Sequence, residues 1–505
     1  MKKFLLTFLS IILTGSFAFT QHLHYNCGTE HTPEERARLL QNKKVAKDLN
    51  ITKSGDISYV PITIHLVANT AGNGRIDEQP VLDNLCRLNV EFLDVGLQFY
   101  MPGEFNYIDN DAIYGGSASS FVIALNSVPG TINTFVGNQI PSQGGGITLG
   151  YYSPAGDYLH LAKTAIGGFE TTNSFVFSHE MGHFFSMPHT FDGWDGSTVY
   201  VPGTPAPGSI SGPSGTWAVE KAARTGPDAN CDTAADTFCD TPPDYRFGFG
   251  WNGPPCLYNA NALDPLGVPV FPQENNQMSY FFGCQERQFT DEQSAVMLAD
   301  YAGRTFNDGT PDGDIDQDAN LVSPVNTTVL FQNVVFDWDP VPNATKYLLE
   351  INRNSNFNPS FVVEEVYLTT NTYTSTLLSN NQTYYWRVKP MNNYDFCQGF
   401  SSTGTFMTGT PTSVNEIPGL SGFSVRPNPV STNSNLQIMA SSEVSKEVNL
   451  NLYNIHGQRI YTSIEQLSQG VNVYNINTGE VANGVYLLTI ENSEGVARKK
   501  VIVTK

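Results

Sequence analysis

Apolar and polar side chains alternate over residues 59–67, a pattern that predicts a strand with one buried face. Residues 79–94 instead repeat apolar side chains at helical spacing and predict a helix. Further stretches with strand character are these: 96–100, 131–136, 150–152 and 158–162. Another helix is expected to begin near Thr172 to Ser174, because these residue types suit the N-cap position. The order of elements predicts an α+β domain with that last helix beneath a twisted sheet.

Two more helices carry start signals, and one long segment carries none. Thr32 followed by Pro33 predicts a helix with proline in its first turn. The segment 290–293 has the spacing of a capping box, which predicts a helix that runs to Gly303. Residues 193–215 are rich in Gly, Pro and Ser and are expected to form an exposed loop.

Beyond residue 320 the pattern changes to short alternating strands with Thr- and Asn-rich turns. Trp338 on an early strand and Trp386 on a late one are typical of an immunoglobulin-like sandwich, predicted over residues 321–408. Two linkers are expected, an acidic one over residues 307–320 and a second one over residues 409–420. Residues 421–505 then predict a second all-β sandwich.

Length, charge and the first residues narrow the class of protein. At 505 residues the chain exceeds what one hydrophobic core usually serves. The 27 basic and 48 acidic side chains give a net charge of −21, which disfavours a nucleic-acid partner. Residues 1–20 combine Lys2 and Lys3 with an apolar stretch, which is typical of a secretory signal peptide. The sequence therefore predicts an exported protein with no transmembrane segment after signal removal.

One short stretch has the spacing of a catalytic metal centre. His179 and His183 are four residues apart, so a helix places both imidazoles on one face, and His189 follows six residues later. Zinc favours nitrogen ligands in a tetrahedron, and a catalytic site keeps one position open for water. Glu180 can reach that water without binding the metal. Ordinary core or surface histidines are the alternative, which the small total of 9 His disfavours.

Seven cysteines in an exported chain are expected to pair and to leave at least one over. Cys27 is the natural candidate for the odd one, because a thiolate is a good fourth zinc ligand that would block a zymogen's site. The alternative is that Cys27 pairs elsewhere or is unreactive. The pairing of the other cysteines stays open, although Cys231 and Cys239 could close a small loop.

The same small loop belongs to an acidic segment over residues 230–244. Its carboxylates are hard oxygen ligands of the kind that hold Ca²⁺. The candidate calcium ligands are Asp232, Asp236 and Asp240. A solvated cluster of capped turns is the alternative interpretation.

These motifs together resemble the pappalysin-type metzincins, more closely their bacterial cytophagalysin branch, from about Asp56 to Phe306. The residues that carry the resemblance are HEMGHFFSMPHTF, NCDTAADTFCDTPPD, NQMSY with the following cysteine, and FTDEQ. The resemblance implies a zinc metalloendopeptidase over residues 56–306. In such an enzyme the three histidines named above hold the metal, and Glu180 is the general acid/base.

The same resemblance assigns further roles. It implies that Met278 forms the Met-turn and that Tyr280 is the switch tyrosine near the reacting groups. It also implies a disulfide between Cys256 and Cys284. Residues 21–55 resemble a propeptide, in which Cys27 followed by glycine matches a cysteine switch.

One position departs from the family pattern. Metzincins place glycine after the helix, where the chain turns sharply, and this chain has Ser186 there. Glycine tolerates a positive φ without steric cost, and serine does not. The turn is therefore expected either to adopt another conformation or to carry strain of about 1 to 3 kcal/mol.

The C-terminal regions carry resemblances of their own. Residues 321–408 are similar in pattern to fibronectin type III domains. Residues 421–505 resemble the type IX secretion sorting domain of Bacteroidetes, through VRPNP, NLYNIHGQ and the GVYLLTI ending. That resemblance implies passage through the outer membrane by the type IX machinery.

The sequence thus predicts a secreted or cell-surface zinc endopeptidase that cuts protein or peptide substrates, with calcium as a second cofactor. Two rival functions remain. One is a non-catalytic adhesin that carries a degenerate protease domain, which only Ser186 favours and an intact Glu180 disfavours. The other is zinc chemistry on a bond that is not a peptide bond, which no motif supports.

Overall fold

The computed structural model describes 26–29, 32–52, 55–138, 140–141, 147–166, 175–194, 200–212, 215–247, 256–281, 283–307, 309–409, 417–432 and 434–504. The chain forms two compact units. The first comprises Met1–Ser323, Asp337–Tyr373 and Tyr385–Gly404, and the second comprises Pro324–Phe336, Thr374–Tyr384 and Thr405–Lys505. The predicted signal peptide lies outside the described residues. No helix in the described ranges is long and apolar enough to cross a membrane.

A sheet with the strand order β1-β7-β8-β5-β2-β3 is the centre of the first unit, with β4 paired to β2 and β6 to β7. Its strands are β1 (Asn26–Cys27), β2 (Ser58–Ala68), β3 (Leu97–Tyr100), β4 (Asn106–Asp109), β5 (Ile132–Gly137), β6 (Ile140–Pro141), β7 (Ile147–Ser153) and β8 (Tyr158–Ala162). β2 runs parallel to β3, β4 and β5, and β7 is antiparallel to β8. The predicted strands of this region are confirmed.

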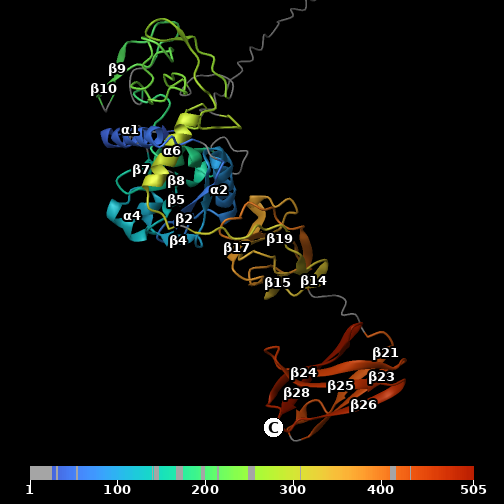
Figure 1. The fold of residues 1–505 in the computed structure, drawn as a ribbon. Coiled ribbons are helices and arrows are strands. Elements are labelled where there is room, and N and C mark those ends of the chain that lie inside the picture. The colour runs from blue at the N-terminus through green and yellow to red at the C-terminus, as the bar shows by residue number, and fades with distance from the viewer. Residues whose placement is uncertain are drawn as a thin grey trace, which may run out of the picture. The chain divides into compact units, whose positions relative to one another are not determined.

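Six α-helices accompany this sheet in the described residues (Figure 1). They are α1 (Pro33–Asp48), α2 (Glu78–Phe92), α3 (Asp111–Tyr114), α4 (Ser120–Asn126), α5 (Val176–Phe184) and α6 (Asp291–Gly303), with short 3₁₀ turns at Leu93–Val95 and Lys163–Ala165. Capping boxes open α1 at Thr32 and α6 at Thr290, as predicted for α6. Helix α5 follows Phe175, which makes no side-chain cap bond. The predicted caps Thr172 to Ser174 lie outside the described residues.

The core of this region lies between the sheet and the helices α2 and α5. Both helices direct apolar side chains into one buried cluster, to which Leu85, Leu88, Met181 and Phe184 belong. α5 contacts β7 and β8, so the predicted placement of this helix against the sheet is confirmed. Helices α1 and α6 lie side by side (Figure 1).

The segment after α5 forms a second, aromatic core. Its short strands are β9 (Ser209–Gly212), β10 (Gly215–Ala218), β11 (Ala262–Leu263) and β12 (Pro269–Val270), which pair as two hairpins. The described part of the predicted exposed loop 193–215 includes β9 and the buried Tyr200 and Ile210. The segment was predicted to be an exposed loop or insertion, and the exposure is wrong for these side chains, because they pack with Trp194 and Tyr245 in the aromatic core.

The next region consists of short strands. They are β13 (Leu321–Ser323), β14 (Thr327–Val329), β15 (Val334–Trp338), β16 (Lys346–Asn352), β17 (Val362–Leu368), β18 (Thr372–Ser375), β19 (Thr383–Met391) and β20 (Gly404–Thr408), with a 3₁₀ turn at Pro359–Phe361. Within the first unit, Cys397 forms a disulfide with Cys86 on α2, and Met391 and Phe396 join the core of the α+β region. One apolar core therefore extends from the sheet into part of this β-rich region.

The C-terminal module is a sandwich of two sheets, with the orders β21-β23-β26 and β22-β28-β27-β24-β25. Its strands are β21 (Leu420–Arg426), β22 (Val430–Ser431), β23 (Asn435–Ser442), β24 (Lys446–Tyr453), β25 (Arg459–Leu467), β26 (Gly470–Asn477), β27 (Gly484–Asn492) and β28 (Gly495–Thr504). Ile438, Leu450 and Leu488 are buried between them. The all-β prediction for this module is confirmed.

Candidate active site

Three histidine side chains converge at the C-terminal end of α5. His179 and His183 lie on that helix, and His189 lies on the turn that follows it. The Nε2 atom of His183 is 3.2 Å from the Nε2 of His179 and 3.2 Å from the Nε2 of His189. All three side chains are buried. Three ring nitrogens thus face one another around one point.

Backbone carbonyls orient two of these rings. The Nδ1 of His179 lies 2.9 Å from the carbonyl oxygen of Gln277, and the Nδ1 of His183 lies 2.7 Å from that of Met187. A proton on each Nδ1 leaves the Nε2 lone pair pointed at the centre. Burial, reinforced by electrostatic interaction with the neighbouring His189, lowers the pKa of His179 well below its usual value. The neutral ring is the form that binds metals.

Cys27 provides a fourth donor from the N-terminal segment. Its Sγ lies 3.4 Å from the Nε2 of His183. The four ligand atoms of Cys27 and the three histidines all lie within 4.8 Å of one another. Burial, reinforced by the negative charge of Glu180, raises the pKa of the Cys27 thiol well above its usual value. Coordination to a cation acts in the opposite direction and favours the thiolate.

Glycine next to Cys27 allows this close approach. β1 pairs with β7, and the amide of Gly28 donates to the carbonyl of Gly150 at 2.9 Å. A Cβ on Gly28 would lie 2.9 Å from the methyl group of Thr148. Only glycine therefore fits between the segment and the strand.

Glu180 is fully buried beside the cluster and is held by the same segment. Its Oε2 accepts a hydrogen bond from the hydroxyl of Thr29 at 3.0 Å and lies 3.4 Å from the Sγ of Cys27. The contact of Thr29 with Glu180 was not predicted from the sequence. The only available signal was a hydroxyl side chain two residues after Cys27. The N-terminal segment thus contacts both a candidate ligand and the candidate general base.

Met278 and Tyr280 both lie close to helix α5 and the histidine cluster. Met278 is fully buried, and a Cβ on Gly182 would lie 2.5 Å from its sulfur, so this turn packs directly beneath the helix. The ring of Tyr280 is 4.9 Å from that of His189 and 5.8 Å from that of His179, measured between centroids. The structure therefore brings both residues to the histidine cluster.

The donors fit zinc. Nitrogen from imidazole and sulfur from a thiolate are the ligand types that zinc takes in proteins, four to a tetrahedron. In the described parts of the chain, Cys27 with the three histidines is the only group of three or more His, Cys, Asp or Glu side chains gathered closely enough to hold a metal.

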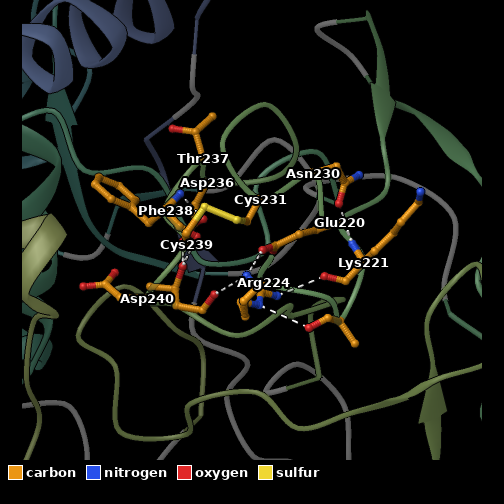
Figure 2. Close-up of polar contacts among 12 residues, drawn as sticks. Glu220, Lys221, Arg224, Asn230, Cys231, Asp236, Thr237, Phe238, Cys239 and Asp240 are labelled. Atoms are coloured by element: carbon orange, nitrogen blue, oxygen red, sulfur yellow. Dashed lines mark hydrogen bonds and ion pairs between the residues drawn. A yellow bond between two sulfur atoms is a disulfide. The ribbon is translucent and has the colours of Figure 1, made fainter. Parts of the chain in front are cut away.

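The predicted calcium ligands of the acidic segment bind separate partners, and Figure 2 shows two of them, Asp236 and Asp240. Asp236 is buried and accepts from the amide of Phe238 at 3.0 Å and the hydroxyl of Thr241 at 2.8 Å. Asp240 accepts from Thr290 and the amide of Glu292 at the start of α6, both at 2.8 Å. Asp232 is exposed. The three predicted calcium ligands are thus not brought to one point.

Glu220 is a buried carboxylate that sequence reasoning missed (Figure 2). Its Oε1 accepts from Arg224 at 2.6 Å, and its buried Oε2 has no hydrogen-bond partner. Burial raises the pKa of Glu220 to about 8 against the opposing effect of Arg224. Burial and the nearby charge of Glu220 also raise the pKa of Asp236 well above its usual value. Glu220 lies outside the acidic segment, and no sequence motif indicates that it is buried near that segment.

Six of the seven cysteines form disulfides. The pairs are Cys86 with Cys397, Cys231 with Cys239, and Cys256 with Cys284. Cys27 alone has a free thiol. The first pair joins residues 311 positions apart, a distance at which sequence gives no signal.

The C-terminal module has a clear family. Residues 424–504 match the secretion system C-terminal sorting domain. The chain is thus a secreted or cell-surface protein that type IX secretion handles, as its motifs predict.

The chain is also similar to known metalloproteases over part of its length. An extracellular metalloprotease of Sordaria macrospora is 26% identical over 213 residues, which are 37% of this chain and 72% of the relative. An extracellular metalloprotease of Colletotrichum graminicola is 27% identical over 209 residues, 37% of this chain and 73% of the relative. A solved structure of a Tannerella forsythia promirolysin mutant aligns with 15% identity and a TM-score of 0.36, over 55% of this chain and 94% of that chain.

Proposed function

We propose that the protein is a secreted zinc metalloendopeptidase of the pappalysin type that is made in a latent form. The observation that carries this proposal is the convergence of three histidine Nε2 atoms beside a buried glutamate. The similarity to two extracellular metalloproteases supports the same reaction class.

His179, His183 and His189 would hold the metal. Zinc, when bound, lowers the pKa of a coordinated water and polarises the scissile carbonyl. Glu180 lies beside the cluster, where its carboxylate can take a proton from the attacking water and pass it to the leaving amine.

Tyr280 is proposed to stabilise the developing oxyanion. Its ring packs at the edge of His189, so its hydroxyl is positioned by the same core as the ligands. A hydroxyl aimed at negative charge that develops in the transition state contributes more than one that binds the substrate equally well.

Cys27 and Thr29 are proposed to impose latency together. The thiol lies in the fourth ligand position, and the Thr29 hydroxyl occupies an oxygen of Glu180. A substrate cannot enter while this segment pairs with β7. Removal of residues 21–55 would free the ligand position and the general base in one step.

Calcium is a second proposed cofactor. Of the three calcium ligands predicted from the sequence, only Asp236 is part of the proposed site. Asp236 and Glu220 are buried carboxylates with raised pKa values, and one Glu220 oxygen has no partner. A cation between them would offset the cost of burying two like charges. Asp232 and Asp240 have no part in it.

Proteolysis by the secreted, processed protein tests the proposal against the adhesin alternative. The processed protein should digest casein or gelatin and should lose that activity in a chelator. Glu180→Ala should keep its zinc and lose about 100- to 10,000-fold in rate. Glu286→Ala, at an exposed position, is the matched control and should keep both. Full proteolysis by Glu180→Ala would sink the assignment, and an inactive wild type that binds zinc would favour the adhesin.

A further inference from the structure

Ser186 has the backbone conformation for which glycine is usual. Its φ is 70°, in the left-handed region. Its amide donates to the carbonyl of His183 at 3.0 Å, and the amide of Met187 donates to that of Gly182 at 3.0 Å. These two bonds are the pair that closes a helix in a Schellman motif. The turn therefore keeps the expected shape and carries a strained serine in place of glycine.

Asp300 binds the side chain of that serine from α6. The Ser186 hydroxyl donates to the Oδ2 of Asp300, and Asn42 donates to the same oxygen at 2.6 Å. Arg38 and Arg304 each donate to its Oδ1 at 2.6 Å. Asp300 is 3% exposed, so these bonds form away from water. A buried carboxylate with four donors is held rigidly.

The same two arginines reach the end of α5. Arg38 donates to the carbonyl of Phe184, its last residue, at 3.0 Å, and Arg304 does so at 2.6 Å. That carbonyl has no partner within the helix, because a helix leaves its last four carbonyls free. Asp300 therefore sits in one network with the helix end and the turn.

This turn sets the geometry of two candidate ligands. The carbonyl of Met187, the residue after the strained serine, accepts from the Nδ1 of His183 at 2.7 Å. His189 follows two residues later on the same turn. A change in the turn would rotate the ring of His183 and displace His189.

We propose that Asp300 is a positioning residue that holds Ser186 in its left-handed conformation and so fixes the metal-binding geometry of His183 and His189. Asp300 thus compensates for the absence of glycine. Helix α1 supplies Arg38 and Asn42, so the N-terminal segment supports the turn as well as covering the site. This inference rests on the proposed zinc site.

Zinc affinity of the full-length chain, measured by competition with a chelator, tests the inference. Ser186→Ala keeps the strain and loses the tether, and should weaken zinc binding about 10- to 100-fold, as loss of outer-shell partners does. Ser186→Gly loses both the strain and the tether, and should weaken it by less than about threefold. Equal losses of zinc affinity in Ser186→Ala and Ser186→Gly would overturn the proposal. This comparison does not depend on whether a variant of Asp300 folds.

Asp300→Asn adds the direct arm. In the otherwise wild-type chain, which has Ser186, this substitution should weaken zinc binding about 10- to 100-fold. In a chain that also carries Ser186→Gly, it should weaken zinc binding by less than about threefold. The visible spectrum of the cobalt-substituted protein should change in Asp300→Asn and return toward the wild type in the double variant. Asp157→Asn, at an exposed partner of Arg304, is the control and should bind zinc like the wild type.

The outcomes separate this inference from the proposed function. An equal loss for Asp300→Asn in both backgrounds would show a general structural role and overturn the inference alone. A wild-type chain that fails to bind one zinc would instead overturn the proposed function.

Discussion

Two groups of candidate metal ligands lie in the first unit, and their atoms are arranged differently. The histidines of α5 direct Nδ1 to backbone carbonyls and turn their Nε2 atoms toward one point. The candidate ligands of the acidic segment form no group close enough to hold a metal. Asp236 binds its own loop, and Asp240 caps α6. Glu220, from outside that segment, has one buried oxygen without a hydrogen-bond partner.

The difference shows what makes a metal site. A high density of ligand residues in the sequence is not enough, because local amides and hydroxyls can use each oxygen. In His179 and His183 the Nδ1 atom is bound to a backbone carbonyl, which leaves the Nε2 lone pair of each ring for a common centre. Strong metal dependence is therefore expected at the histidines and weak dependence at the acidic segment.

His183→Ala should produce the largest effect. Loss of the central imidazole removes one of three nitrogen ligands, so zinc affinity should fall by more than about 100-fold, the upper end for outer-shell changes. Metal analysis after dialysis and casein digestion measure the two losses. His456→Ala, at an exposed position in the sorting domain, should change neither. Retained stoichiometric zinc in His183→Ala would remove the contrast with the acidic segment.

Tyr280→Phe should have a smaller and more selective effect. The ring that packs on His189 is kept, and only the hydroxyl is lost. The kcat of the processed protein should fall about 100- to 1,000-fold with zinc content and KM unchanged, as for the loss of one oxyanion donor. A rise in KM with an unchanged kcat would instead place the hydroxyl in substrate binding.

Glu220→Gln should have the smallest effect and should show it in pH dependence. The pKa of Glu220 is raised to about 8 in the folded chain, so its protonated form is stabilised by folding. That stability is complete below the usual value near 4.5 and is lost as the pH rises toward 8. Without calcium, the Tm of the wild type should therefore fall over this range.

The Glu220→Gln variant and the addition of calcium test that expectation further. In Glu220→Gln the Tm should fall less between pH 4.5 and pH 8 than in the wild type. Each kcal/mol of unfolding free energy that the variant retains at pH 8 corresponds to about 2 to 4 °C in Tm. Millimolar calcium should raise the Tm of the wild type at pH 8 and leave Glu220→Gln unchanged. Asp232→Asn, which alters an exposed member of the acidic segment, should respond like the wild type. If the rise in Tm with calcium is lost in Asp232→Asn, calcium binds in the acidic segment, and the proposed site at Glu220 is wrong.

Elements with local signals could be predicted from the sequence. Period-two alternation located β2, and a capping box located the start of α6, because the causes of both lie within a few residues. The spacing of His179, His183 and His189 indicated a common centre for the same reason. The hairpin β9–β10 was missed, since Gly- and Pro-rich composition does not show which aromatic side chains a distant segment will bury.

Long-range partners could not be predicted. Ser186 was recognised as a departure, but its compensation comes from Asp300, more than 100 residues away. Cys86 and Cys397 are still further apart in sequence, by 311 positions. Glu220 is an ordinary glutamate until the fold buries it near Asp236. In each case tertiary packing, and not local pattern, decides which polar atoms meet.

Zinc K-edge X-ray absorption of the full-length chain is the most direct test of the zinc site, because it reads the donor atoms themselves. The account predicts one zinc with three nitrogen ligands at about 2.0 Å and one sulfur at about 2.3 Å. In Cys27→Ser the sulfur shell should disappear and the nitrogen shell should remain. A full-length chain without zinc, or zinc bound by several sulfurs or by oxygen alone, would contradict the account.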